Sequence, residues 1–152
     1  MKNGKKLLTK QKKKKMNTDI KEIDLSYWGG FMDGESSIKL YKRAKKNSIG
    51  KIYDCYEPKV EVTNTDILLI EQMIKTFQVG YIYLDKPRKT EKGTECKQIA
   101  RWIVTYQNAY HVLKIMLPYL REVNKKKGAE EIINYYETRI GKPKIKQISR
   151  LL

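Results

Sequence analysis

The chain has 152 residues, enough for one domain with a buried core, and a formal net charge of +16. Residues 1–16 carry eight lysines and no acid, so residues 17–152 still hold 25 basic and 17 acidic side chains, a net +8. A surplus of this size indicates a polyanionic partner. No apolar run approaches the roughly 20 residues of a transmembrane helix, and no basic amphipathic helix indicates a membrane surface.

Cysteine and histidine content excludes further classes of protein. Cys55 and Cys96 form no spacing motif, so we expect free thiols in a reduced intracellular compartment, a prokaryotic cytoplasm or an organelle or nucleus. With His111 as the sole histidine and no paired cysteines, a zinc site is not expected. Leu7 and Leu8 are too short an apolar core for a signal peptide.

The first third of the chain predicts an arm, a helix and a hairpin. Residues 1–17 have no periodic apolar face, and we expect a disordered basic arm. A helix is predicted from residue 18 to about residue 34, with Thr18 or Asp19 as its cap. Residues 36–45 and 51–63 alternate and predict two strands joined by a loop. Their expected inward positions are Ile38, Leu40, Ala44, Ile52, Tyr56, Val60 and Val62.

The remainder of the chain repeats the order of helix and hairpin. Residues 64–66 supply cap candidates for a helix at 66–77. A strand at 81–84, a basic loop at 85–93 and a strand at 96–105 follow. Which side chains of the last strand face the core is left open. Asn108 is the expected cap of a helix to residue 117, and another helix spans 128–140 after three lysines. We therefore predict an α+β domain over 18–141, an antiparallel sheet with its helices on one face, and a basic tail or short helix over 142–152.

The first predicted helix contains an unusual combination of glycines and acids. Gly in a helix interior costs about 0.5–1 kcal/mol relative to Ala, and Gly30 and Gly34 lie on one face, where they allow close approach of a second backbone. Asp33 and Glu35 lie at the C-terminal end, where the helix dipole disfavours negative charge. The pattern suggests a nearby cation; the alternative is a Gly-rich helix end with solvated acids.

Residues 28–36 (WGGFMDGES) resemble the nine-residue signature of the LAGLIDADG homing endonucleases. The departures are Trp28 for the opening Leu, Glu35 for the last Asp and Ser36 for the final Gly. Further similar segments recur in order at 62–66 (VTNTD), 79–82 (VGYI) and 117–120 (LPYL). The resemblance covers roughly residues 18–140 and includes one copy of the signature.

The resemblance implies the αββαββ homing-endonuclease fold and a homodimer. Two copies are expected to pack through Ser26, Gly30, Asp33 and Gly34, so that their sheets form a saddle over the major groove of double-stranded DNA. The implied activity is cleavage of both strands at a long pseudo-palindromic site, leaving short 3′ overhangs. The implied partners are DNA and a second copy, with no membrane and no small-molecule substrate. The gene of such a protein is expected in an intron or intein.

The resemblance also implies roles at the cleavage site. Glu35 is the expected ligand of Mg²⁺, with Mn²⁺ as substitute, together with the carbonyl of Gly34; Asp33 is expected to cap or to serve the interface. Asn64 aligns with a residue that positions the nucleophilic water, although an N-cap is the alternative. Lys125 aligns with the family's basic residue that stabilises transition-state charge, and Lys126 or Lys127 are alternatives.

The outward faces of the strands are the expected DNA-reading surface, although the same pattern also fits an ordinary solvated sheet. The residues concerned are Ser37, Lys39, Tyr41, Arg43, Lys45, Tyr53, Glu57, Lys59, Glu61, Tyr83, Lys86 and Arg101.

Two other functions fit part of the sequence. One is nucleic-acid binding by the same fold without cleavage, as an RNA maturase or DNA-binding regulator, although Glu35 argues against lost cleavage. A basic ribosome-associated protein fits the charge, but it does not explain glycines and acids together on the first helix.

Overall fold

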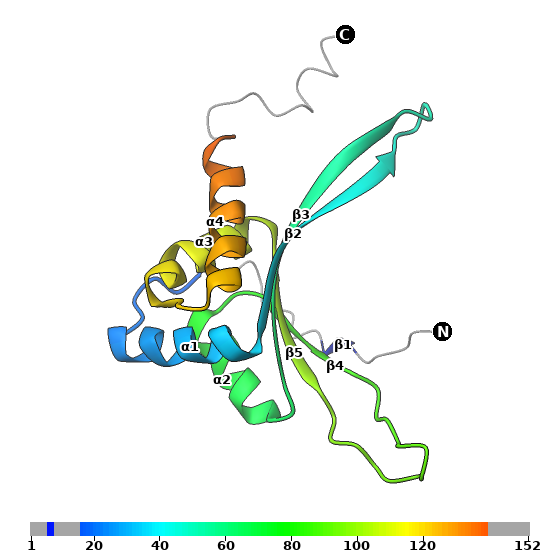
Figure 1. The fold of residues 1–152 in the computed structure, drawn as a ribbon, viewed down its shortest axis with the longest axis vertical. Helices are drawn as coiled ribbons and strands as arrows, with labels where there is room; N and C mark the ends of the chain where they lie inside the picture. The colour runs from blue at the N-terminus through cyan, green and yellow to red at the C-terminus, as the bar shows by residue number, and fades with distance from the viewer. Residues whose placement is uncertain (1–5, 8–15, 140–152) are drawn as a thin grey trace.

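The computed structural model describes residues 6–7 and 16–139, in which four α-helices cover one face of an antiparallel sheet (Figure 1). The helices are α1 (Glu22–Glu35), α2 (Ile67–Phe77), α3 (Tyr106–Met116) and α4 (Val123–Glu137), with a 3₁₀ turn η1 (Leu117–Tyr119) before α4. The strands are β1 (Lys6–Leu7), β2 (Ser36–Lys46), β3 (Ile52–Asn64), β4 (Tyr81–Leu84) and β5 (Ala100–Thr105), in the order β1-β4-β5-β3-β2. The predicted α+β class is confirmed. Among these helices, none is long and apolar enough to cross a membrane.

The β2–β3 hairpin is longer than the helical layer that covers it. Its register runs from Ser36 opposite Val62 to Lys46 opposite Ile52, and Figure 1 shows the distal end extending beyond the helices. Near the base of the hairpin, Val62 is fully buried, whereas Ile52 at the tip is 68% exposed. The predicted inward burial of Ala44 and Ile52 is therefore wrong, because no helix lies behind that part of the sheet.

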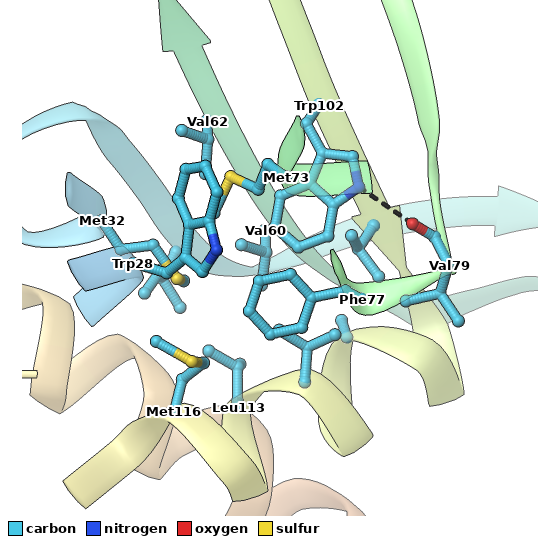
Figure 2. Packing of buried hydrophobic residues seen from close by; sticks show 14 of the residues in the cluster. Trp28, Met32, Val60, Val62, Met73, Phe77, Val79, Trp102, Leu113 and Met116 are labelled. Atoms are coloured by element: carbon cyan, nitrogen blue, oxygen red, sulfur yellow. Dashed lines mark hydrogen bonds between the residues drawn. The ribbon is translucent and has the colours of Figure 1, made fainter. Parts of the chain in front are cut away.

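The hydrophobic core lies between the helices and the sheet (Figure 2). Trp102 of β5 is fully buried, stacks on Phe77 of α2 at 5.2 Å and donates from Nε1 to the carbonyl of Val79 at 2.9 Å. This inward side chain settles the phase of β5, because its neighbour Arg101 then points to the outward face. Trp28 of α1 is part of the same core.

Several predicted element boundaries were wrong. The N-cap of α1 is Lys21, without a side-chain bond, instead of Thr18 or Asp19. Thr105 precedes α3, so Asn108 lies inside the helix. β5 begins at Ala100 because residues 85–99 form a loop closed on itself by a bridge between residues 89 and 95.

Helix α4 begins five residues before the predicted start. Its N-cap is Glu122, whose carboxylate accepts a hydrogen bond from the backbone N–H of Lys125 at 2.7 Å. The three lysines at 125–127 thus lie within the helix instead of preceding it. Gly128 lies against β2: a Cβ at this position would overlap the carbonyl oxygen of Ile38.

The N-terminal arm differs from the expectation at the positions that the structure describes. Lys6–Leu7 pairs with β4, and Asn17 donates from its backbone N–H to the carbonyl of Phe77 at 3.0 Å. The rest of the arm, at 1–5 and 8–15, lies outside the described residues, as does the predicted tail at 142–152.

Candidate nucleic-acid interface and cleavage site

The outward face of the sheet gathers the strand residues that the sequence indicated for DNA contact. Residues directly opposite each other in an antiparallel pair project to the same face. Lys39 lies opposite Lys59, and Lys59 lies opposite Thr105. The same register places on this face Ser37, Tyr41, Arg43, Lys45, Tyr53, Glu57, Glu61, Tyr83 and Arg101. Lys86 lies on the exposed loop after β4.

Several charges on this face are paired with one another. Arg101 contacts Asp85 and Glu61, and Glu61 also contacts Lys59. Arg43 pairs with Glu57 at 3.4 Å. The sequence had indicated five of these side chains as direct DNA contacts, and it gave no role to Asp85, which begins the basic loop.

Glu35 is the last residue of α1, and its side chain is exposed at the start of the sheet. The next residue, Ser36, is buried, and its backbone N–H donates to the carbonyl of Met32 at the helix end. No basic residue lies in the last turn of α1 to offset the negative end of the helix dipole. The carboxylate of Glu35 is therefore open to solvent at the negative end of the helix dipole.

Lys125 reaches the same place from α4. Its ammonium group donates a hydrogen bond to the backbone carbonyl of Ser36, next to Glu35 in the chain. Lys125 is half-buried, whereas Lys126 and Lys127 are exposed. Among the three lysines, the geometry therefore favours Lys125 at this site.

Asp33 has a structural role within one chain. Its carboxylate accepts hydrogen bonds from the backbone N–H of Arg121 at 3.0 Å and of Glu122 at 3.1 Å. Because Glu122 caps α4, this contact fixes the start of α4 against the end of α1. It therefore also fixes the backbone from which Lys125 extends.

Asn64 ends β3 at the same end of the sheet. The register places Ser36 opposite Val62, only two residues before Asn64. The Oδ1 atom of Asn64 accepts from the backbone N–H of Asp66 at 2.8 Å, while Asp66 itself caps α2 by accepting from Leu69 at 3.2 Å. The N-cap position thus belongs to Asp66, and Asn64 shapes the turn before it.

The glycines of α1 divide between two environments. Gly29 is buried, and a Cβ there would lie 2.6 Å from the carbonyl oxygen of Tyr119. Gly30 and Gly34 are exposed, and a Cβ on either would meet nothing within 4 Å. A hollow of about 310 Å³ on this side is lined by Ser26, Gly30, Asp33, Pro118, Tyr119 and Arg121. The small-residue face of α1 is thus open to another backbone.

Exposed apolar side chains continue this open face toward the start of α1. Ile23 is 76% exposed and Tyr27 is 56% exposed. Trp28, the residue after Tyr27, is buried instead, and the two rings meet edge to face at 4.9 Å.

The donor set at the helix end fits a hard divalent cation. Among the described residues, no group of three or more His, Cys, Asp or Glu side chains forms a metal-binding cluster. Mg²⁺ does not require such a cluster, because it binds through one or two carboxylates with retained waters and substrate phosphates. Glu35 supplies the carboxylate, and carbonyls in the last turn of a helix, such as that of Gly34, lack intrahelical partners.

A model of the LAGLIDADG endonuclease family matches residues 28–117, which include the end of α1 and the whole sheet from β2 to β5. The chain belongs to the LAGLIDADG endonuclease family. The resemblance noted in the sequence is thereby confirmed. No curated protein sequence matches the chain.

Solved LAGLIDADG structures share the fold. The homing endonuclease I-CvuI in complex with its target is 17% identical, with a TM-score of 0.55, and the match covers 74% of this chain and 64% of that one. I-CeuI complexed with DNA is 16% identical, with a TM-score of 0.56 and coverages of 80% and 57%. The chain thus spans less than two thirds of either. The homing endonuclease I-TnaI is 17% identical, with a TM-score of 0.51 and coverages of 76% and 75%.

Two further features of this LAGLIDADG chain have a partial signal in the sequence. Gly128 interrupts a helix pattern as Gly30 and Gly34 do, and the same reasoning predicts close backbone approach, here to Ile38. Asp85 follows a strand and precedes a basic loop, but its pairing with Arg101 depends on the register of β4 and β5.

Proposed function

We propose that this LAGLIDADG chain is a site-specific double-strand DNA endonuclease that acts as a homodimer with a divalent metal ion. The observation that carries the proposal is the bond of Lys125 to the residue that follows Glu35 in the chain. Glu35 ends α1, and Lys125 binds the carbonyl of the next residue at the start of the sheet. An acid for the metal and a cation for phosphate charge therefore adjoin a face suited to DNA.

The outward face supports binding in the major groove. A two-stranded β-ribbon fits this groove, where side chains read base edges. β2 and β3 form such a ribbon, and Lys39, Tyr41 and Lys45 project from its exposed part. Cations elsewhere on the chain are expected to contact phosphates, which position the protein without reading sequence.

The open face of α1 supports a symmetric dimer. Gly30 and Gly34 leave space for a second backbone, and the exposed Ile23 and Tyr27 would gain burial there. A two-fold contact between copies of this helix brings two Glu35 carboxylates toward each other. One protein dimer then has one carboxylate for each DNA strand.

The residues at the helix end have distinct roles in phosphodiester hydrolysis. A divalent ion supplies charge neutralisation at the phosphate and an activated water when it is bound. Glu35 and the Gly34 carbonyl hold that ion. Lys125, placed by its bond to Ser36, stabilises the charge of the transition state. Asn64 orients the attacking water from the end of β3.

A selection from a randomised DNA pool tests the proposal. Purified protein is incubated with the pool in Mg²⁺, in Mn²⁺ and in EDTA, and both bound and cleaved molecules are sequenced. We expect a long pseudo-palindromic site, cleavage only with the metal ions, and short 3′ overhangs. Specific binding without cleavage would instead support a regulator or maturase, and no sequence preference would contradict a site-specific DNA-binding role.

A further inference from the structure

Four charged side chains form a continuous chain of contacts across the outward face. The Asp85 carboxylate accepts from Nε and Nη2 of Arg101, each at 2.8 Å. Nη1 of Arg101 donates to Oε1 of Glu61 at 2.6 Å, and the other oxygen of Glu61 lies 2.8 Å from Nζ of Lys59. This set, Asp85–Arg101–Glu61–Lys59, links the residue after β4 to the start of β5 and to the second half of β3.

The environment keeps this four-residue network ionised and ordered. Burial alone would raise the pKa of Glu61, but hydrogen bonds from Lys59 and Arg101 lower it below its usual 4.5. The bond from Arg101 likewise lowers the pKa of Asp85, against the opposing effect of burial. The Glu61 and Asp85 side chains are 17% and 16% exposed, so solvent competes weakly for their oxygens.

The network makes Arg101 and Glu61 poor direct readers of bases. Arginine reads guanine by two parallel hydrogen bonds from one edge of its guanidinium. In this structure Asp85 uses one such edge, and Glu61 uses the remaining nitrogen. A base contact by either residue would require breaking a charge-assisted bond, which costs more than breaking a neutral one.

Lys59 is the end of the network and has a different environment. It lies directly opposite Lys39, so two like charges share one cross-strand site, an arrangement that is destabilising without a counter-charge. Glu61 supplies that counter-charge. Fixing a lysine side chain costs up to about 2 kcal/mol of rotamer entropy. The bond to Glu61 orders the Lys59 side chain in the free protein, before DNA binds.

We propose that Asp85, Arg101 and Glu61 are positioning residues that hold Lys59 for recognition of a guanine in the major groove. This inference rests on the proposed DNA-binding function and assigns sequence preference to residues that contact no base. Lysine donates to O6 and N7 of guanine, which gives the preferred base.

The test is selection by binding alone, from the same randomised pool, with single variants. Wild type is expected to prefer guanine at one symmetric pair of positions. Lys59→Met should abolish that preference, and Glu61→Gln and Arg101→Met should reduce it about 5–10-fold. Arg101→Lys, which keeps a cation beside both acids, should restore part of it.

Lys42→Met is the matched control. Lys42 pairs with Asp54 at 3.2 Å on the opposite face of the same hairpin, so its loss should leave the guanine preference unchanged. Thermal unfolding is measured for every variant.

The outcomes separate this inference from the proposed function. If wild type selects a site but Glu61→Gln and Arg101→Met keep its guanine preference, the inference is wrong. It is also wrong if these variants weaken preference equally at all positions in proportion to lost stability. If wild type shows no sequence preference, both the proposed function and the inference are overturned.

Discussion

The ammonium group of Lys125 donates a hydrogen bond to the carbonyl of Ser36, the residue that follows Glu35 in the chain. Lys125 belongs to α4 and Ser36 to β2, and they lie 89 positions apart in the chain. Their contact brings a cation to the end of α1 without a direct ion pair between Lys125 and Glu35. Glu35 thus keeps its carboxylate exposed for a metal ion.

Replacement of single lysines should identify the one that acts in cleavage. Lys125→Met is expected to lower the cleavage rate about 100-fold, comparable to the loss of one charge-stabilising donor in other enzymes. Lys126→Met and Lys127→Met should change it little, because both side chains are exposed. Single-turnover cleavage of the selected site measures all three rates, and equal losses would contradict the assignment to Lys125.

The two acids of α1 should separate chemistry from stability. Glu35→Gln should bind the same DNA within about 2-fold but cut at least 100-fold more slowly, since even partners of metal ligands contribute about 10–100-fold. Asp33→Ala should cost about 0.5–1.5 kcal/mol of unfolding free energy, because two partly solvent-accessible backbone N–H groups lose their carboxylate partner. Normal cutting by Glu35→Gln would refute the metal assignment.

The glycines should separate dimer formation from folding of the monomer. Gly34→Leu faces open space in the monomer and removes a glycine from the last turn of α1, so the monomer should gain up to about 1 kcal/mol. The proposed dimer should nevertheless dissociate, because the side chain would block the approach of a second α1. Sedimentation equilibrium measures the change, and a Gly34→Leu dimer as stable as wild type would contradict the interface.

A substitution at Gly128 provides the contrasting case. Gly128→Ala places a methyl group against the Ile38 carbonyl and should destabilise the fold by about 1–3 kcal/mol. Urea unfolding is the measurement. The loss of unfolding free energy should appear at protein concentrations where wild type is already monomeric. Gly34→Leu should show no such loss under the same conditions.

The charged network should give a defined pH dependence of stability. The pKa values of Glu61 and Asp85 are lowered in the folded state, below 4.5 and 3.8 respectively. The stability that the two ionised carboxylates contribute to the folded state is therefore fully present above those values. It is lost as the pH falls through the lower folded-state pKa values. Glu61→Gln should cost about 1 kcal/mol at pH 7 and progressively less below about pH 4. Urea unfolding at pH 3–7 measures the difference, and a constant cost would contradict the ionic origin.

The glycines of α1 show how much a local pattern can predict. Their spacing indicated close backbone approach, and the approach occurs at Gly29 within the chain, while Gly30 and Gly34 remain open. A helical period identifies which residues share a face, but not which face meets the rest of the same chain.

The sequence by itself determined the order of elements, the alternation of the strands and the acid-ended helix, because these depend on spacing along one segment. The outward face of β2 and β3 followed from a period of two residues. Only the tertiary structure decided that Asp33 binds the start of α4, that Lys125 reaches Ser36, and that Arg101 is held by Asp85 and Glu61. These contacts join residues 16 to 89 positions apart, and their geometry depends on strand register and helix packing, which no single segment specifies.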